Sequence, residues 1–165
     1  MFSQINGLPL HVLIVHAAVV AVPLAALLAI LFVVPRTRAW SRLPLLIVAT
    51  VAAIAVYIAK LTGGSFRHAL ERNNGPGWIS SQIGSLVQQH AQRANVLLVI
   101  VVIFAVIVVV AFAASHRPST FTRPIAFVVS AVLLVGAAAL VVQTYRVGDI
   151  GARAVWNPTG TVNYK

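Results

Sequence analysis

Residues 94–114 read ANVLLVIVVIFAVIVVVAFAA, with no charged side chain in the run. Three further apolar runs lie near residues 11–34, 43–62 and 122–145. Each is close to the ~20 residues that an α-helix needs to cross a hydrocarbon core ~30 Å thick. The sequence therefore predicts an all-α fold, an integral membrane four-helix bundle that forms a single domain. The predicted spans, which include short helical extensions, are about 11–34, 43–62, 88–114 and 122–146.

Composition supports a membrane protein and limits its chemistry. Hydrophobic residues make up 60% of the 165 residues, and the mean hydropathy is +0.96. Soluble domains are about half apolar. The chain has no cysteine, which excludes disulfides, thiolate-held iron–sulfur clusters and covalent c-type haem attachment. Any metal must therefore be bound by imidazole, carboxylate, backbone or methionine groups.

The chain is strongly basic, with a formal net charge of +10 from 12 basic residues against Glu71 and Asp149. The basic residues gather at the ends of the spans, where they attract anionic lipid headgroups. A nucleic-acid partner is not expected, because the charges do not line one soluble face.

The arrangement of charge also predicts an orientation. An even number of spans places both termini on one side of the membrane. The two short connections on the other side are rich in arginine, which favours a cytoplasmic location for them. The termini and most histidines are then predicted to be extracytoplasmic, in a bacterial inner (plasma) membrane. The arginines of the short connections are Arg36, Arg38, Arg42, Arg117 and Arg123.

Glycine and proline mark the expected boundaries between segments. Gly63-Gly64 is expected to end the second span, because glycine weakens a helix. Residues 63–90 are predicted to form a loop with an amphipathic segment, and residues 150–165 an irregular interfacial tail. No internal repeat is evident from the sequence.

The histidines are the most informative side chains. His11 and His16 open the first span, and His90 precedes the third apolar run. Ionisable side chains are costly within a membrane and mark functional sites. We predict a haem b group with His16 and His90 as axial ligands and His11 as the substitute for either. His11 and His16 diverge by about 140° on a helix, so they cannot both point at one iron.

Other polar residues near the same end are candidates to support this site. Three arginines are predicted to pair with haem propionates by charge-assisted hydrogen bonds, namely Arg93, Arg146 and Arg153. Asp149 is predicted to accept a proton from a ligating imidazole and fix its orientation. Further candidates for the surrounding polar shell are Gln92, Asn95 and Tyr145.

The order of several short motifs resembles a known family. These are residues 6–11 (NGLPLH), followed by Val15-His16 and Pro23, then His90-Ala91 before the third apolar run, and residues 148–156 (GDIGARAVW). Together they resemble the bacterial family called domain of unknown function 2231. The resemblance implies a small four-span membrane protein, and the joining of some members to Rieske domains implies electron transfer. The chain departs from the family pattern at Asp149, where many relatives have histidine, and at Val12, where proline is common.

These observations favour an electron carrier or binding protein over a stand-alone enzyme. The leading hypothesis is a b-type cytochrome near the outer membrane face that transfers electrons or senses redox state, with a quinone or a redox protein as partner. The first alternative is a zinc- or copper-binding protein or transporter that uses His11, His16 and His90. The second is a non-catalytic membrane subunit. A homo-oligomer is compatible with each of these hypotheses.

Overall fold

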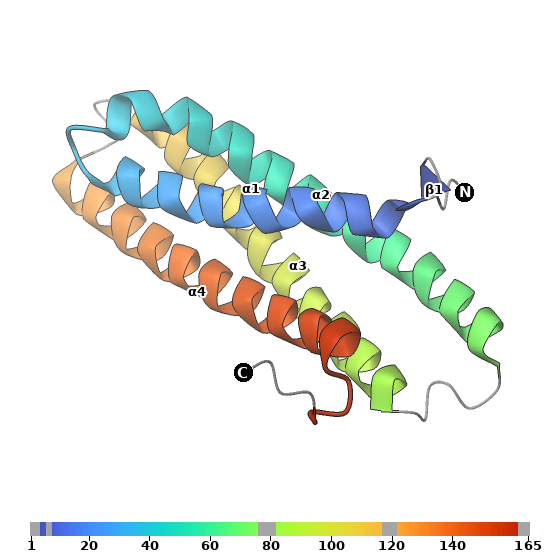
Figure 1. Cartoon of the computed structure of the whole chain (residues 1–165). Helices are drawn as coiled ribbons and strands as arrows, with labels where there is room; N and C mark the ends of the chain where they lie inside the picture. Colours follow the sequence, from blue (N-terminus) through green and yellow to red (C-terminus); the bar gives the residue numbers. More distant parts are fainter. Residues whose placement is uncertain (1–3, 6–7, 76–81, 117–121, 162–165) are drawn as a thin grey trace.

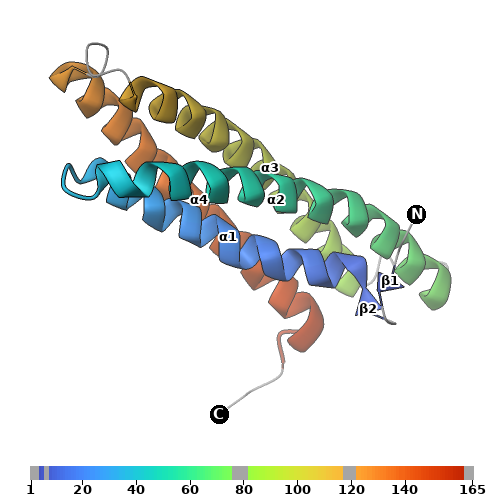
Figure 2. The same cartoon turned by 90° about the horizontal axis from the view of Figure 1, so that it is seen from above.

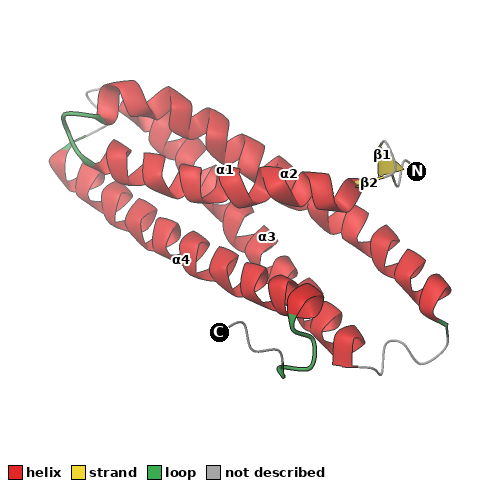
Figure 3. Ribbon diagram, viewed as in Figure 1, coloured by secondary structure: helices red, strands yellow, loops and turns green. Residues whose placement is uncertain are grey.

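The computed structural model describes residues 4–5, 8–75, 82–116 and 122–161. Four long helices account for nearly all of them (Figures 1 and 3). A two-residue antiparallel pair precedes the first helix, with Gln4 opposite Pro9. The elements are β1 (Gln4–Ile5), β2 (Leu8–Pro9), α1 (Leu10–Val33), α2 (Arg38–Asn74), α3 (Gln82–Ser115) and α4 (Arg123–Trp156).

The helices form a bundle in which α1 and α3 each pack against both α2 and α4. Because α1 and α3 each pack against α2 and α4, they lie diagonally across the bundle. Consecutive helices run in opposite directions (Figures 1 and 2). The start of α1, the start of α3, the end of α2 and the end of α4 therefore lie at one end, here called the histidine end. β1, which precedes α1, and the end of α4 both lie at this end (Figure 1).

The predicted all-α four-span membrane fold is confirmed. All four helices are long and apolar enough to cross a membrane. Their outward surfaces carry large apolar side chains, such as Val20, Phe127 and Val135, which are 66%, 76% and 71% exposed. Water would make such a surface unfavourable, whereas lipid matches it.

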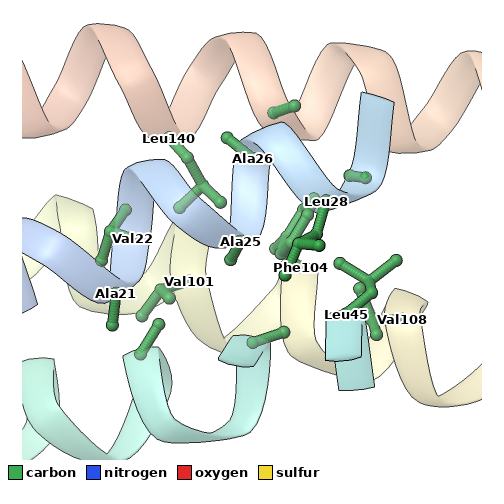
Figure 4. Close-up of a cluster of buried hydrophobic side chains, with 14 of the residues drawn as sticks. Ala21, Val22, Ala25, Ala26, Leu28, Leu45, Val101, Phe104, Val108 and Leu140 are labelled. Carbon is green, nitrogen blue, oxygen red and sulfur yellow. The ribbon is translucent and has the colours of Figure 1, made fainter. Parts of the chain in front are cut away.

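The packed core occupies the part of the bundle away from the histidine end. Many of its members are alanine, and small side chains let membrane helices approach closely. Figure 4 shows Phe104 of α3 among the buried side chains of this core. The fully buried apolar residues lie within residues 18–32 of α1, 45–56 of α2, 97–111 of α3 and 133–140 of α4. Closer to the histidine end, no apolar side chain of the described residues is fully buried.

Several predicted boundaries are wrong. Gly63-Gly64 does not end a helix, because α2 continues to Asn74. A helix-interior glycine costs only about 1 kcal/mol relative to alanine, and Gly63 lies where a neighbouring helix comes close. The predicted loop at 63–90 is mostly helix, since α3 already begins at Gln82. The tail predicted from residue 150 is likewise helical as far as Trp156.

Candidate functional site

His11 is held between α1 and α2 at the histidine end. It is the second residue of α1, its side chain is half-buried, and its Nδ1 lies 2.9 Å from the backbone oxygen of Ala59. The hydroxyl of Thr62 is 3.4 Å from the same nitrogen. The ring of Phe66 stacks on the imidazole, with 5.8 Å between ring centroids and 21° between planes. The carbonyl of Ala59, the hydroxyl of Thr62 and the ring of Phe66, all in α2, thus fix the orientation of this imidazole.

Gly63 allows this close approach of α1 and α2. A Cβ atom on Gly63 would lie 3.1 Å from Cε1 of His11 and 3.3 Å from its Nδ1. Contacts this short would displace the ring. The glycine that was expected to end the helix therefore makes room for the imidazole.

His90 is held in the same way between α3 and α4. It is half-buried, and its Nδ1 lies 3.0 Å from the backbone oxygen of Val147. A Cβ atom on Gly151 would lie 3.1 Å from both Cε1 and Nδ1 of His90. His11 and His90 belong to diagonal helices, and both lie at the histidine end of the bundle. The structure therefore holds these two histidines in the same manner at one end of the bundle.

The hydrogen bonds determine which ring nitrogen is available. A carbonyl oxygen can only accept, so Nδ1 carries the proton in both His11 and His90. Nε2 then keeps its lone pair, which is the arrangement of a neutral imidazole that ligates a metal. Among the described residues, neither Nε2 has a hydrogen-bond partner.

His16 does not join this pair. It is exposed on the outer face of α1, and its Nδ1 bonds to the oxygen of Val12 in the same helix at 2.6 Å. Unlike His11 and His90, the predicted ligand His16 is therefore not held against a neighbouring helix. His68 is exposed, and its Nδ1 lies 3.3 Å from Oε2 of Glu71. His116 follows the end of α3, where its Nδ1 bonds to the backbone oxygen of Phe112.

The predicted supporting residues lie around the pair rather than between its members. Arg93 and Arg146 are exposed, as are the three side chains proposed for the polar shell, Gln92, Asn95 and Tyr145. Asp149 does not accept from His90. It forms an ion pair with Arg153, one turn later on α4, at 3.0 Å.

The site lies at the level of a belt of basic residues. Lys60 is adjacent to Ala59, Arg146 is adjacent to Val147, and Arg93 is about one turn from His90. From Arg42 to Lys60 the helix rises about 27 Å, and from Arg123 to Arg146 about 35 Å, at 1.5 Å per residue. These lengths bracket a hydrocarbon core of ~30 Å. The two histidines thus lie near one end of a stretch whose length matches the hydrocarbon region.

Gln143 connects α3 and α4 just inside this level. Its side chain is 4% exposed, and its Nε2 donates to the backbone oxygen of Arg93 at 2.8 Å. Its place in an apolar span, one turn before Val147, is the sequence signal that identifies it. Buried polar groups in membrane helices usually bond to a neighbouring helix.

Replacement of Gln143 by leucine tests this connection. We expect the free energy of unfolding to fall by about 0.5–1.5 kcal/mol, the usual net value of one hydrogen bond. Thermal unfolding in detergent, followed by far-ultraviolet circular dichroism, measures the change. The control is Gln92→Leu, which replaces an exposed glutamine of α3. Equal loss of stability in both variants would contradict the assignment.

These features define a class: a four-span membrane protein with two half-buried histidines at one end of the bundle. Residues 7–163 match the family model DUF2231, described as a predicted membrane protein. The chain belongs to this family. The comparisons with curated proteins and with solved structures give no match.

Proposed function

We propose that this protein is a b-type cytochrome that binds haem between His11 and His90. One observation carries the proposal. Two half-buried imidazoles lie at the same end of the bundle on diagonal helices, and each donates Nδ1–H to a backbone carbonyl of its neighbouring helix. Ligating histidines almost always donate their second ring nitrogen in this way, which orients the ring and raises its basicity.

The number of ligands favours haem over a bare metal ion. Haem iron takes its equatorial ligands from the porphyrin and needs from the protein only axial groups, such as two imidazoles. Zinc is usually held by three or four protein ligands. Among the residues that the structure describes, no group of three or more histidine, cysteine, aspartate or glutamate side chains could hold an ion. The zinc or copper alternative therefore has less support.

The surroundings of the pair suit a large planar group. Apolar side chains of the described helices are fully buried only away from this end, so a bound macrocycle would supply apolar contacts between the helices. Thr144, on the face of α4 that carries Val147, has a buried hydroxyl oxygen without a hydrogen-bond partner in the described part of the chain. A bound group is one source of such a partner.

The positive charges near the two histidines also suit the propionate groups of haem. Arg93 and Arg146 are exposed at the level of the pair and are available for haem propionates. Arg153 is less suitable, because its guanidinium already pairs with Asp149. Anionic lipid headgroups are the other natural partners of these cations.

In this proposal the protein carries electrons within the bacterial plasma membrane. The arginine-rich short connections would be cytoplasmic, and the haem would lie near the outer boundary. A membrane quinol or a redox protein on the outer side is the proposed partner. When bound, the haem supplies a one-electron redox centre, and the chain supplies its axial ligands, its orientation and its apolar surroundings.

The test is a dithionite-reduced minus oxidised visible spectrum of the full-length protein, purified in detergent from cells supplied with haem. We expect the sharp α band of b-type haem and about one haem per chain by the pyridine haemochrome method, since one histidine pair binds one iron. A featureless spectrum would overturn the proposal. Elemental analysis of the same sample for zinc and copper would then decide between a metal site and a non-catalytic subunit.

A further inference from the structure

The two histidine sites are built from the same three parts. Each has an imidazole on one helix, a carbonyl acceptor on the next helix, and a glycine against the ring. The acceptor and the glycine are four residues apart in both cases, Ala59 and Gly63 in α2, Val147 and Gly151 in α4. This shared construction indicates a relation between the two halves of the chain.

One constant shift relates α1 to α3. A shift of 79 residues, from 11 to 90, carries His11 onto His90. The same shift carries five buried residues of α1 onto five buried residues of α3. The pairs are Ala18 with Leu97, Val22 with Val101, Ala25 with Phe104, Ala29 with Val108, and Phe32 with Ala111.

A second constant shift relates α2 to α4. A shift of 88 residues, from 63 to 151, carries Gly63 onto Gly151, Ala59 onto Val147 and Tyr57 onto Tyr145. It also matches buried residues: Leu45 with Leu133, Ala49 with Ala137, Ala52 with Leu140, and Ala55 with Gln143.

Helical periodicity alone does not explain these matches. It lets buried positions of two helices coincide, but it does not place a histidine, its carbonyl acceptor and its glycine at equivalent positions in both halves. The helix contacts agree as well, because α1 packs against α4 as α3 packs against α2. Equivalent helices run in the same direction, so a rotation about the bundle axis relates the halves (Figures 1 and 2).

We infer that the chain consists of two copies of one helical hairpin, α1–α2 and α3–α4, and that its ligand lies between them on the pseudo-twofold axis. Each copy presents one imidazole, so the ligand must accept one nitrogen ligand on each of two opposite faces. Gly63 and Gly151 are equivalent positioning residues that set the angle of each ring. The identity of the ligand as haem rests on the proposed function.

The expectation of no internal repeat is thus wrong, for a physical reason. The second shift exceeds the first by nine residues (88 against 79). Three come from the longer connection between α3 and α4, three from the later end of α3 and three from the earlier start of α4, each relative to its equivalent in the first half. A single period therefore does not align the halves. The two copies also differ next to one of the histidines. Phe66 stacks on His11, whereas the residue equivalent to Phe66 in the second copy is Ala154.

Matched glycine substitutions in the full-length protein test the inference. We expect Gly63→Ala and Gly151→Ala each to lower haem affinity by about 10–100-fold, as loss of an orienting group does at other metal sites. Both should also shift the electron paramagnetic resonance signal of the ferric protein, which depends on imidazole orientation. The controls are Gly64→Ala and Gly148→Ala, where an added Cβ meets no atom within 4 Å. They should leave affinity and signal unchanged.

The outcomes separate the inference from the proposed function. An effect at only one of Gly63 and Gly151, at neither, or equally at the controls would overturn the inference. If wild-type protein binds no haem, the proposed function fails, and ¹⁵N spectra of the haem-free protein decide the inference instead. Gly63→Ala must then move the imidazole signals of His11, and Gly151→Ala those of His90. The wild-type spectrum gives a check without variants: both imidazoles must be the Nδ1–H tautomer, and different tautomers would overturn the inference.

Discussion

Replacement of His90 by alanine is expected to abolish haem binding, and His11→Ala is expected to do the same. Loss of an orienting partner of a metal ligand typically costs about 10–100-fold in affinity, and loss of the ligand itself should cost more. Each variant keeps the helix, because alanine has the highest helix propensity. The measurement is the Soret absorbance of detergent-purified protein after titration with haem, relative to wild type.

The matched control for these variants is His16→Ala. His16 is on the same helix as His11, but it is exposed and bonds only to its own turn. We expect this variant to bind haem like wild type. Loss of haem from His16→Ala with retention in His11→Ala would contradict the assignment of ligands and restore the pairing predicted from sequence.

Gly136→Ala is expected to destabilise the bundle, and the effect should be large for a substitution that adds only one methyl group. A Cβ atom on Gly136 of α4 would lie 2.7 Å from Cδ2 of Phe104 in α3. Phe104 is 1% exposed and surrounded by core side chains (Figure 4), so its ring has little room to move. Overpacking of this kind costs about 1–3 kcal/mol. The midpoint of thermal unfolding in detergent should fall accordingly.

A compensating substitution makes this prediction specific. In a Phe104→Leu background the clashing ring edge is absent, so Gly136→Ala should cost much less than in the wild-type background. The difference between the two costs is the coupling between residues 104 and 136. Gly148→Ala is the control for helix propensity, because its Cβ meets nothing within 4 Å. Equal costs for Gly136→Ala in both backgrounds would show that the contact does not limit packing.

Much of the candidate site was available from sequence, and one further signal was missed. The sequence places His90 at the start of the third span, and the structure has it in the first turns of α3, whereas depth in apolar sequence favours His16 over His11. The spacing of small residues points to His11 instead. It lies seven residues before Ala18 and fourteen before Ala25, so it shares their face of the helix. Small residues usually face other helices within a membrane.

The sequence alone determined the class of fold. Four apolar runs of about 20 residues leave the backbone no way to satisfy its hydrogen bonds in lipid except as helices. It also determined that any metal must be bound without thiolates, since the chain has no cysteine. These conclusions depend on composition and length, which do not change with the packing of the helices.

Only the tertiary structure decided which histidines are held against a neighbouring helix. An apolar span such as α1 is hydrophobic on all sides, so hydrophobicity does not reveal which face meets the other helices. Packing fixed the rotation of each helix, and it turned His11 and His90 inward and His16 outward. It also brought Gly63 and Gly151, distant in sequence, against those two rings. The cause is physical: contact between helices depends on their rotation and depth relative to one another, which neither the composition nor the length of a span determines.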